Sequence, residues 1–141
     1  MTSLSTNAFM SKIIHSMIRV LHLDPSLKFY AECFGLHPSH RLDFPGFSLV
    51  YLRNSENDAE IELTWNKDRK EPYTHGDGYG HVGVCVADVA LERSRLLTLG
   101  YAPLDIKEFK ADDGSLIARY FFIQDPDGYK VEILERHGHY Q

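Results

Sequence analysis

The sequence is short of the features that mark secreted, membrane-spanning and nucleic-acid-binding proteins. It has two cysteines, Cys33 and Cys85, with neither a CxxC pair nor the spacing of a disulfide framework, so we expect reduced thiols in a cytoplasmic protein. No apolar run approaches the roughly 18 residues of a membrane span, and the N-terminus lacks a signal-peptide pattern. The net charge is −5 without a basic stripe, which argues against nucleic acid and anionic membranes as partners.

What is present is enough for one ordinary globular domain. The chain has 141 residues, of which 43% are hydrophobic and 25% are charged. A chain of this size buries roughly 68–70% of its unfolded surface, so it needs neither disulfides nor structural zinc for a stable core. We therefore expect one domain, or two small modules that share a core.

The first half of the chain predicts a strand, a helix and three further strands. Asp24-Pro25 is typical of a helix start, with Asp as the cap, and Gly35 is typical of a helix end. Alternating apolar residues and turn signals predict the strands, near residues 12–20, 36–43, 47–53 and 59–65.

The second half repeats that order. Asp88 is positioned to cap a helix that ends at Gly100, and Asp125-Pro126-Asp127-Gly128 predicts a tight turn between the last two strands. The predicted strands lie near residues 79–86, 101–107, 116–124 and 129–135. The predicted organisation is an N-terminal tail at 1–11, a first module at 12–65, a linker at 66–78, a second module at 79–136 and a short tail at 137–141.

Each half carries one histidine on its first strand and one glutamate on its last strand. In the stretch 59–66, alternation places Glu62 on the face opposite Ile61 and Leu63. Glu62 follows its histidine by 47 positions, and the glutamate of the second half follows by 51. The four-residue set is His15, Glu62, His81 and Glu132. Two imidazoles and two carboxylates suit a borderline divalent cation such as Ni²⁺, Co²⁺, Zn²⁺ or Mn²⁺.

Each of these residues also has an ordinary structural interpretation. A single strand histidine such as His15 is more often a surface or core residue than a ligand, and a strand glutamate such as Glu62 usually belongs to a solvated face. No local ligand spacing such as HExxH marks the site, so the metal hypothesis depends on the repeat. The other histidines are interpreted as loop, surface or tail residues, namely His22, His37, His40, His75, His137 and His139.

Five stretches form a further pattern, namely HSMIRV, FYAECFGL, IELTWN, YGHVGVCV and DPDGYKVEIL. Through these stretches the chain resembles, over about residues 12–136, glyoxalase I (lactoylglutathione lyase) of the vicinal oxygen chelate superfamily. The second and last of these are common across the superfamily, whereas the four-residue set is more specific. The resemblance implies an α+β fold of two βαβββ modules related by a pseudo-twofold repeat.

The resemblance also implies roles for individual residues. The four-residue set would bind the metal, with water completing an octahedron, and Glu132 would be the proton-transferring base while Glu62 serves the opposite face of the substrate. Arg19 and Asn66 match residues that hold the γ-glutamyl end of glutathione. The implied protein is a homodimer whose sites take ligands from both subunits, with nickel or cobalt favoured over zinc.

The implied reaction is the isomerisation of the methylglyoxal–glutathione hemithioacetal to S-D-lactoylglutathione, which needs a metal and a carboxylate base. The sequence departs from the family pattern after Asn66 and in the long acidic stretch 107–115. These departures leave the thiol cosubstrate open, because the cation for the glycyl carboxylate can be Lys107, Lys110 or Arg119. Lys110 is preferred.

Two other functions remain open at this point. One is a different metalloenzyme of the superfamily, such as a dioxygenase, an epimerase or a thiol transferase, which would keep its metal after Glu62→Gln. The other is a metal-free binding protein of the bleomycin-resistance kind, in which the four-residue set would be incidental.

Overall fold

The computed structural model describes residues 8–141. The chain divides into two compact units, one reaching to Glu71 and the other running from Pro72 to Gln141. Of the predicted tail at 1–11, residues 1–7 lie outside the described residues, and residues 8–11 are exposed. Within the described part of the chain, no helix is long and apolar enough to cross a membrane.

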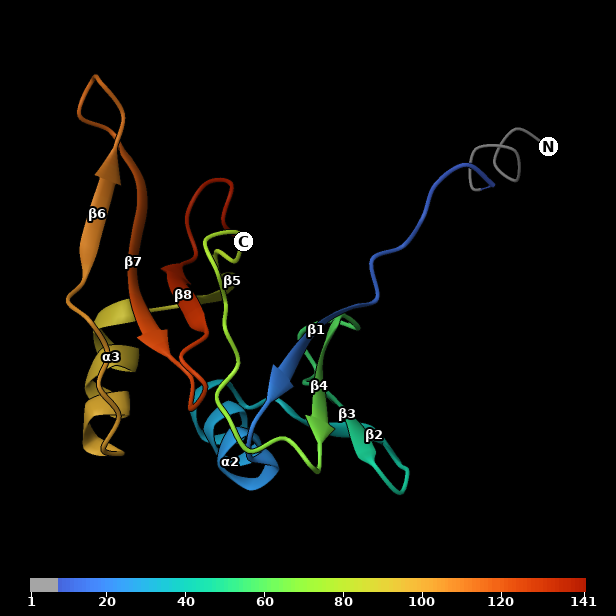
Figure 1. Cartoon of the computed structure of the whole chain (residues 1–141). Coiled ribbons are helices and arrows are strands. Elements are labelled where there is room, and N and C mark those ends of the chain that lie inside the picture. Colours follow the sequence, from blue (N-terminus) through green and yellow to red (C-terminus); the bar gives the residue numbers. More distant parts are fainter. Residues whose placement is uncertain (1–7) are drawn as a thin grey trace. The chain divides into compact units, whose positions relative to one another are not determined.

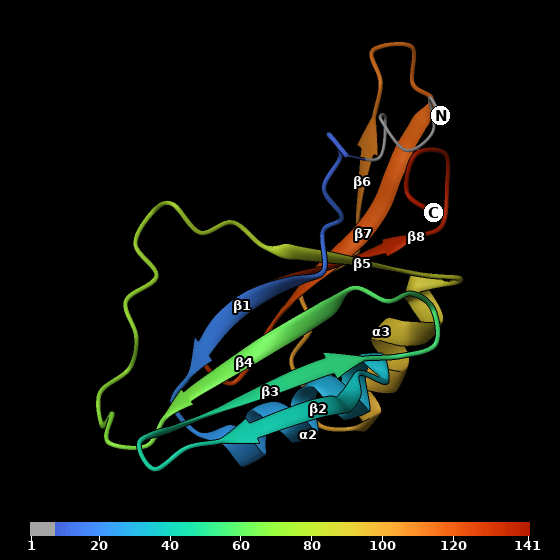
Figure 2. The same cartoon turned by 90° about the vertical axis from the view of Figure 1, so that its right-hand side faces the viewer.

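The first unit is a four-stranded sheet with one helix. Its elements are β1 (His15–Val20), α2 (Leu23–Phe34), β2 (His37–Asp43), β3 (Phe47–Arg53) and β4 (Glu60–Asn66). The strand order is β1-β4-β3-β2, and the first and last strands pair in parallel. Figure 2 shows α2 behind this sheet. Val20, Val50, Leu52 and Leu63 are fully buried together with Phe29 and Tyr30 of the helix, so one face of the sheet is apolar and covered.

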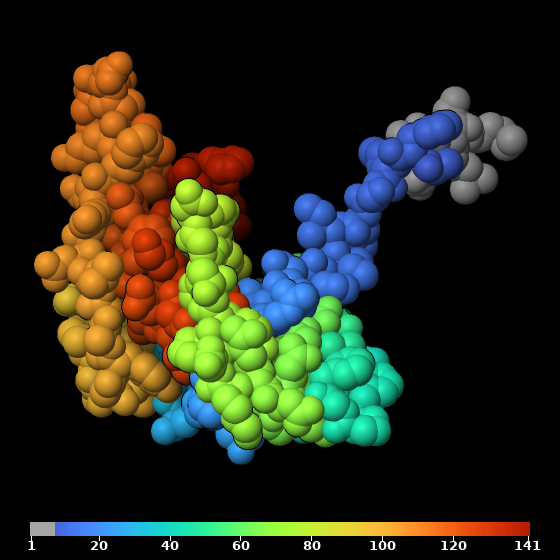
Figure 3. Space-filling model, in the orientation of Figure 1, coloured from blue at the N-terminus to red at the C-terminus, as the bar shows by residue number. Residues whose placement is uncertain are grey.

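The second unit repeats this topology. Its elements are β5 (Val82–Val86), α3 (Val89–Thr98), β6 (Lys107–Lys110), β7 (Leu116–Gln124) and β8 (Lys130–Glu135). The strand order is β5-β8-β7-β6, again with the first and last strands in parallel (Figure 1). The helix contacts β7 and β8. The β6–β7 hairpin, drawn in orange, extends as a narrow projection from its own unit (Figure 3).

The predicted order of strand, helix and three strands is confirmed in both halves, and the fold is α+β with two βαβββ modules. Two local signals are also confirmed. The Asp88 carboxylate accepts a hydrogen bond from the Leu91 N–H at 3.0 Å and caps α3. In the turn 125–128 the Gly128 N–H donates to the Asp125 carbonyl at 2.9 Å, and Gly128 has a φ of 86°, which glycine adopts without strain.

Several predicted boundaries are wrong. The cap of α2 is His22, not Asp24, which lies in the first turn where its charge favours the helix dipole. The strand predicted at 101–107 begins only at Lys107, because Pro103 has no N–H with which to continue a ladder. In the same segment, the Leu104 N–H donates to the Phe122 carbonyl at 2.9 Å. The end of α3 agrees with the prediction, because Thr98 is its last residue, Leu99 is its cap, and Gly100 follows with a φ of 94°.

The first strand of each module is also shorter than predicted. β1 begins at His15 rather than Lys12, since its register with β4 starts at the pair His15–Glu60. β5 begins at Val82 rather than Tyr79, and Gly80 is a poor strand residue. His81 therefore immediately precedes β5 instead of lying within it.

Candidate metal centre

The first unit brings His15 and Glu62 into direct contact. His15 Nε2 lies 3.1 Å from Glu62 Oε1. The parallel register pairs Met17 with Glu62, so His15 stands two residues before the position opposite the glutamate. Both side chains lie on the face of the sheet opposite buried Ile18 and Val20, as alternation requires. Glu62 is only 8% exposed, so its interpretation as part of a solvated face is wrong.

The second unit brings His81 and Glu132 together in the same way. His81 Nε2 lies 3.3 Å from Glu132 Oε1. Gly83 is paired with Glu132, so this histidine also stands two residues before the position opposite its glutamate. The repeat between the halves therefore extends to the register of the strands and to the side chains that meet across them.

The donors in each pair are suited to a metal ion. Imidazole nitrogens and carboxylate oxygens bind divalent cations at about 2.0–2.2 Å, so neighbouring ligands of one ion are about 3 Å apart, as in both pairs. Among residues 8–141, no group of three or more His, Cys, Asp or Glu side chains is placed to hold a metal. Each unit has one His–Glu contact with two candidate donors.

A hydroxyl group and an aromatic ring lie beside the His15–Glu62 pair. Thr64 Oγ1 donates to Glu62 Oε2 at 3.3 Å. Tyr51 lies directly opposite Glu62 on β3. Burial raises the pKa of Tyr51, and the negative charge of Glu62 raises it further. The Tyr51 ring also meets the His15 ring edge-on, with centroids 5.5 Å apart.

An aromatic residue occupies the equivalent position in the second unit. Phe122 lies directly opposite Glu132 on β7, and its ring meets the His81 ring edge-on at 5.2 Å. The sequence pattern did not predict a role for Tyr51 or Phe122. A signal existed, because they precede the glutamates of the two halves by 11 and 10 positions.

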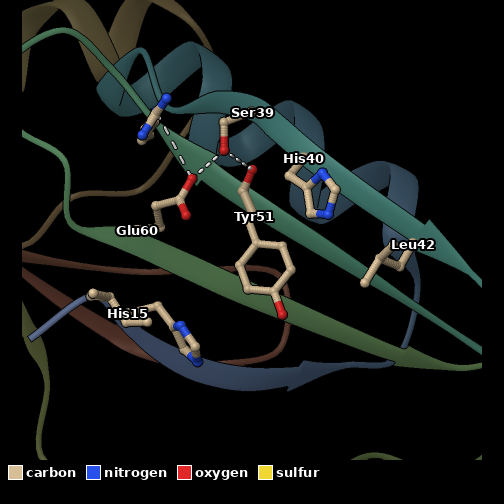
Figure 4. A pocket seen from close by; sticks show the side chains of 8 residues that line it. His15, Ser39, His40, Leu42, Tyr51 and Glu60 are labelled. Carbon is tan, nitrogen blue, oxygen red and sulfur yellow. Dashed lines mark hydrogen bonds and ion pairs between the residues drawn. The ribbon is translucent and has the colours of Figure 1, made fainter.

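A pocket of about 400 Å³ opens beside His15 in the first unit. In Figure 4 the Tyr51 ring reaches from its strand towards His15, while the Ser39 hydroxyl donates to the Glu60 carboxylate. The pocket is lined by Ile14, His15, Ser39, His40, Leu42, Tyr51, Arg53 and Glu60. Space for a small organic group thus adjoins the His15–Glu62 pair.

The residues predicted to bind the thiol lie on both units. Arg19 and Asn66 are each four positions beyond His15 and Glu62, on the same face, roughly 13 Å along the strands at 3.3 Å per residue. Lys110 ends β6 in the other unit and is exposed, with its Nζ 3.7 Å from a carboxylate oxygen of Glu108.

The two remaining cation candidates differ in their surroundings. Arg119 is held between two carboxylates, at 2.8 Å from Glu108 and 3.0 Å from Glu135, and both contacts raise its pKa. Lys107 begins β6 and is exposed. An arginine already engaged by two carboxylates is a poorer partner for a third, which keeps Lys110 the preferred cation.

The sequence matches the profile of the Glyoxalase/Bleomycin resistance protein/Dioxygenase superfamily over residues 12–133. The chain belongs to this superfamily. Among curated superfamily members, it is 34% identical over 130 residues to the probable lactoylglutathione lyase of Synechocystis sp., covering 87% of this chain and 94% of that protein. It is also 34% identical over 128 residues to the lactoylglutathione lyase of Haemophilus influenzae, covering 88% and 92% of the two chains.

Solved structures of the superfamily have a similar fold. The fold matches the glyoxalase I of Leishmania major, described as trypanothione-dependent, with a TM-score of 0.71 and 31% identity over 89% of this chain and 87% of that one. It matches the glyoxalase I of Zea mays with a TM-score of 0.76 and 28% identity, over 90% of this chain and 45% of the maize chain.

His75 has a role that the sequence did not predict. We expected His75 to be a loop or surface residue. It does lie in a loop, but its ring stacks on Tyr129 with centroids 4.1 Å apart and planes 7° from parallel. The His75 Nε2 atom is buried. The stack ties the segment before His81 to the turn before β8, which carries Glu132.

Proposed function

We propose that this protein is a lactoylglutathione lyase, which isomerises the hemithioacetal of methylglyoxal and glutathione to S-D-lactoylglutathione in the cytoplasm. The observation that carries the proposal is the pair of His–Glu contacts in equivalent registers of two repeated modules. The lactoylglutathione lyases of similar length, 34% identical over most of both chains, support the same activity.

The proposed cofactor is one divalent metal per site, with Ni²⁺ or Co²⁺ favoured and Zn²⁺ possible. His15, Glu62, His81 and Glu132 would hold it, because each pair alone offers only two ligands. In the proposed homodimer, one subunit supplies the first pair and its partner supplies the second. When bound, the metal would polarise the oxygens of the substrate and stabilise negative charge on them.

The carboxylates perform the proton transfer in this proposal. Glu132 takes the proton from the carbon bearing sulfur and the hydroxyl, and returns it to the adjacent former carbonyl carbon. The hydroxyl proton of that first carbon passes to the oxygen of the former carbonyl, and the first carbon becomes the thioester carbonyl. The reaction is therefore an isomerisation without net oxidation or reduction. Glu62 faces the opposite side of the substrate. Neither Cys33 nor Cys85, both free thiols, is required.

The thiol cosubstrate would extend from the metal along the strands of the sheet. Arg19 and Asn66 would bind the γ-glutamyl end, since they share a face with His15 and Glu62 at a distance that suits the length of a tripeptide. Lys110 would bind the glycyl carboxylate. A thiol cosubstrate with less negative charge than glutathione is the second candidate, because the β6–β7 hairpin carries the acidic residues Glu108, Asp112 and Asp113. The similar Leishmania major enzyme is described as trypanothione-dependent.

The test is metal reconstitution. Protein stripped with a chelator should lose thioester formation from preformed hemithioacetal, and one of Ni²⁺, Co²⁺, Zn²⁺ or Mn²⁺ should restore it by at least about 100-fold. Glutathione and trypanothione hemithioacetals are compared in parallel to identify the thiol. Full activity in the stripped, metal-free protein would contradict the proposal, as would stoichiometric metal binding without turnover of either thiol.

A further inference from the structure

The histidines of the two His–Glu pairs are held by different parts of the fold. His15 is the first residue of β1, in register with Glu60, and the Glu60 N–H donates to the Ile14 carbonyl at 2.9 Å. The strand ladder therefore already fixes the backbone at His15. His81, by contrast, lies just outside β5, whose register with β8 starts one residue later, at Val82. The position of His81 therefore depends on the segment that precedes it.

That segment, residues 75–80, is rich in glycine. It reads HGDGYG, so every second residue from Gly76 to Gly80 lacks a side chain. Glycine loses more conformational freedom on folding than other residues, so a segment of this kind needs other contacts to order it. At Gly78 and Gly80 a Cβ would meet nothing within 4 Å, and neither residue has a positive φ. The folded backbone therefore does not itself require glycine at these two positions.

Two aromatic side chains near the ends of this segment pack on Tyr129. The His75 ring stacks on the Tyr129 ring, with centroids 4.1 Å apart and planes 7° from parallel. The Tyr79 ring meets Tyr129 edge-on at 5.2 Å, and its hydroxyl donates to the Lys130 carbonyl at 3.4 Å. Tyr129 is buried and immediately precedes β8. The segment is therefore anchored to the strand whose glutamate contacts His81.

The His75 ring packs through its flat face and not through Nε2. This atom is buried and, among the residues that the structure describes, has no hydrogen-bond partner. The ring also lies close to the turn 125–128, since a Cβ built on Gly128 would be 3.6 Å from His75 Cε1. Burying a polar atom without a partner costs free energy, so an apolar ring of similar shape should suit this position at least as well. The stacking contact can thus be separated from the polar atoms by substitution.

We propose that His75 is a positioning residue, whose stack on Tyr129 anchors the glycine-rich segment and keeps the His81 imidazole beside Glu132. The inference rests on the proposed function, in which His81 is a metal ligand. A ligand that is already in place raises metal affinity, because it does not have to be ordered when the metal binds. The anchor should therefore act on metal affinity and on the order of residues 76–81, and not on the sheet of the second unit.

The experiment compares His75→Ala with His75→Phe in the full-length protein. His75→Ala removes the stack and should weaken Co²⁺ affinity about 10- to 100-fold, measured in competition with a chromophoric chelator. His75→Phe keeps a flat ring on Tyr129 and should bind Co²⁺ like the wild type. In the metal-free protein, the amides of residues 76–81 should exchange hydrogen faster in His75→Ala, while those of β7 and β8 keep wild-type rates. His139→Ala is the matched control, because it removes an exposed imidazole that contacts a tyrosine ring in the C-terminal tail.

Gly78→Ala tests the same relation in the other direction. A side chain at this position restricts the unfolded segment without a clash, so Co²⁺ affinity should rise about two- to fivefold and hydrogen exchange of residues 76–81 should slow. Because this variant keeps the stack, unchanged or weaker Co²⁺ binding in it would overturn the positioning role even if His75→Ala fails to fold.

Two results with the His75 variants would overturn the positioning role of the stack and leave the proposed function standing. One is wild-type Co²⁺ affinity in His75→Ala, and the other is an equal loss of affinity in His75→Ala and His75→Phe. A wild-type protein that binds no Co²⁺ would overturn the proposed function as well.

Discussion

Glu132→Gln should lower kcat by roughly 10²- to 10⁴-fold, the usual contribution of general acid–base catalysis. The amide keeps the shape of the side chain but cannot accept the proton from the substrate carbon. The protein should remain folded because Glu132 lies at the polar face of the sheet and is not part of the apolar core. The measurement is the initial rate of thioester formation at saturating metal.

Glu135→Gln on the same strand is the matched control for this loss. Glu135 contacts Arg119 at 3.0 Å rather than either histidine, so its loss of charge should leave the rate close to that of the wild type. A Glu132→Gln enzyme within tenfold of the wild-type rate would show that another group removes the proton. The assignment of Glu132 as base would then be wrong.

Mixing two inactive variants should restore activity if each site takes one His–Glu pair from each subunit. In a dimer of one Glu62→Gln subunit and one Glu132→Gln subunit, one site carries both substitutions and the other carries neither. Random exchange of subunits makes half of the dimers mixed, so about a quarter of the wild-type activity should return. The assay is the rate of thioester formation after the two variants are unfolded together and refolded.

The control for the mixing experiment is each variant refolded alone, which should stay inactive. A site built within a single subunit would contain one substitution in every case, and mixing would restore nothing. Recovery to about a quarter therefore supports shared sites in a homodimer. Its absence in a protein shown to exchange subunits would contradict them.

The parts of the fold that local rules govern were predictable from the sequence. The Asp88 cap and the Asp125–Gly128 turn satisfy their own backbone groups within a few residues, so short sequence signals are enough to place them. The Asp24 cap was wrong because the same residue type stabilises a helix both at the cap and within the first turn, and the sequence does not distinguish the two positions.

The His–Glu contacts of the candidate site were predictable from the sequence, but their surroundings were not. Repetition of His15 and Glu62 as His81 and Glu132 is visible in the sequence, and the structure brings each pair together. The position of Tyr51 was not predictable, since its place opposite Glu62 depends on the register between β3 and β4, which alternation alone does not determine. A one-residue slip would have turned Tyr51 to the other face.

The central claim is that the two His–Glu pairs together bind one metal ion, and a Ni²⁺ titration by calorimetry tests it most directly. We predict one tightly bound Ni²⁺ per chain in the metal-stripped wild type, and loss of tight binding in both His15→Ala and His81→Ala, because each removes a ligand from the same ion. His137→Ala, in the C-terminal tail, should bind Ni²⁺ like the wild type. Tight binding that survives in either His15→Ala or His81→Ala would show that the two pairs do not share a metal, and would contradict the account.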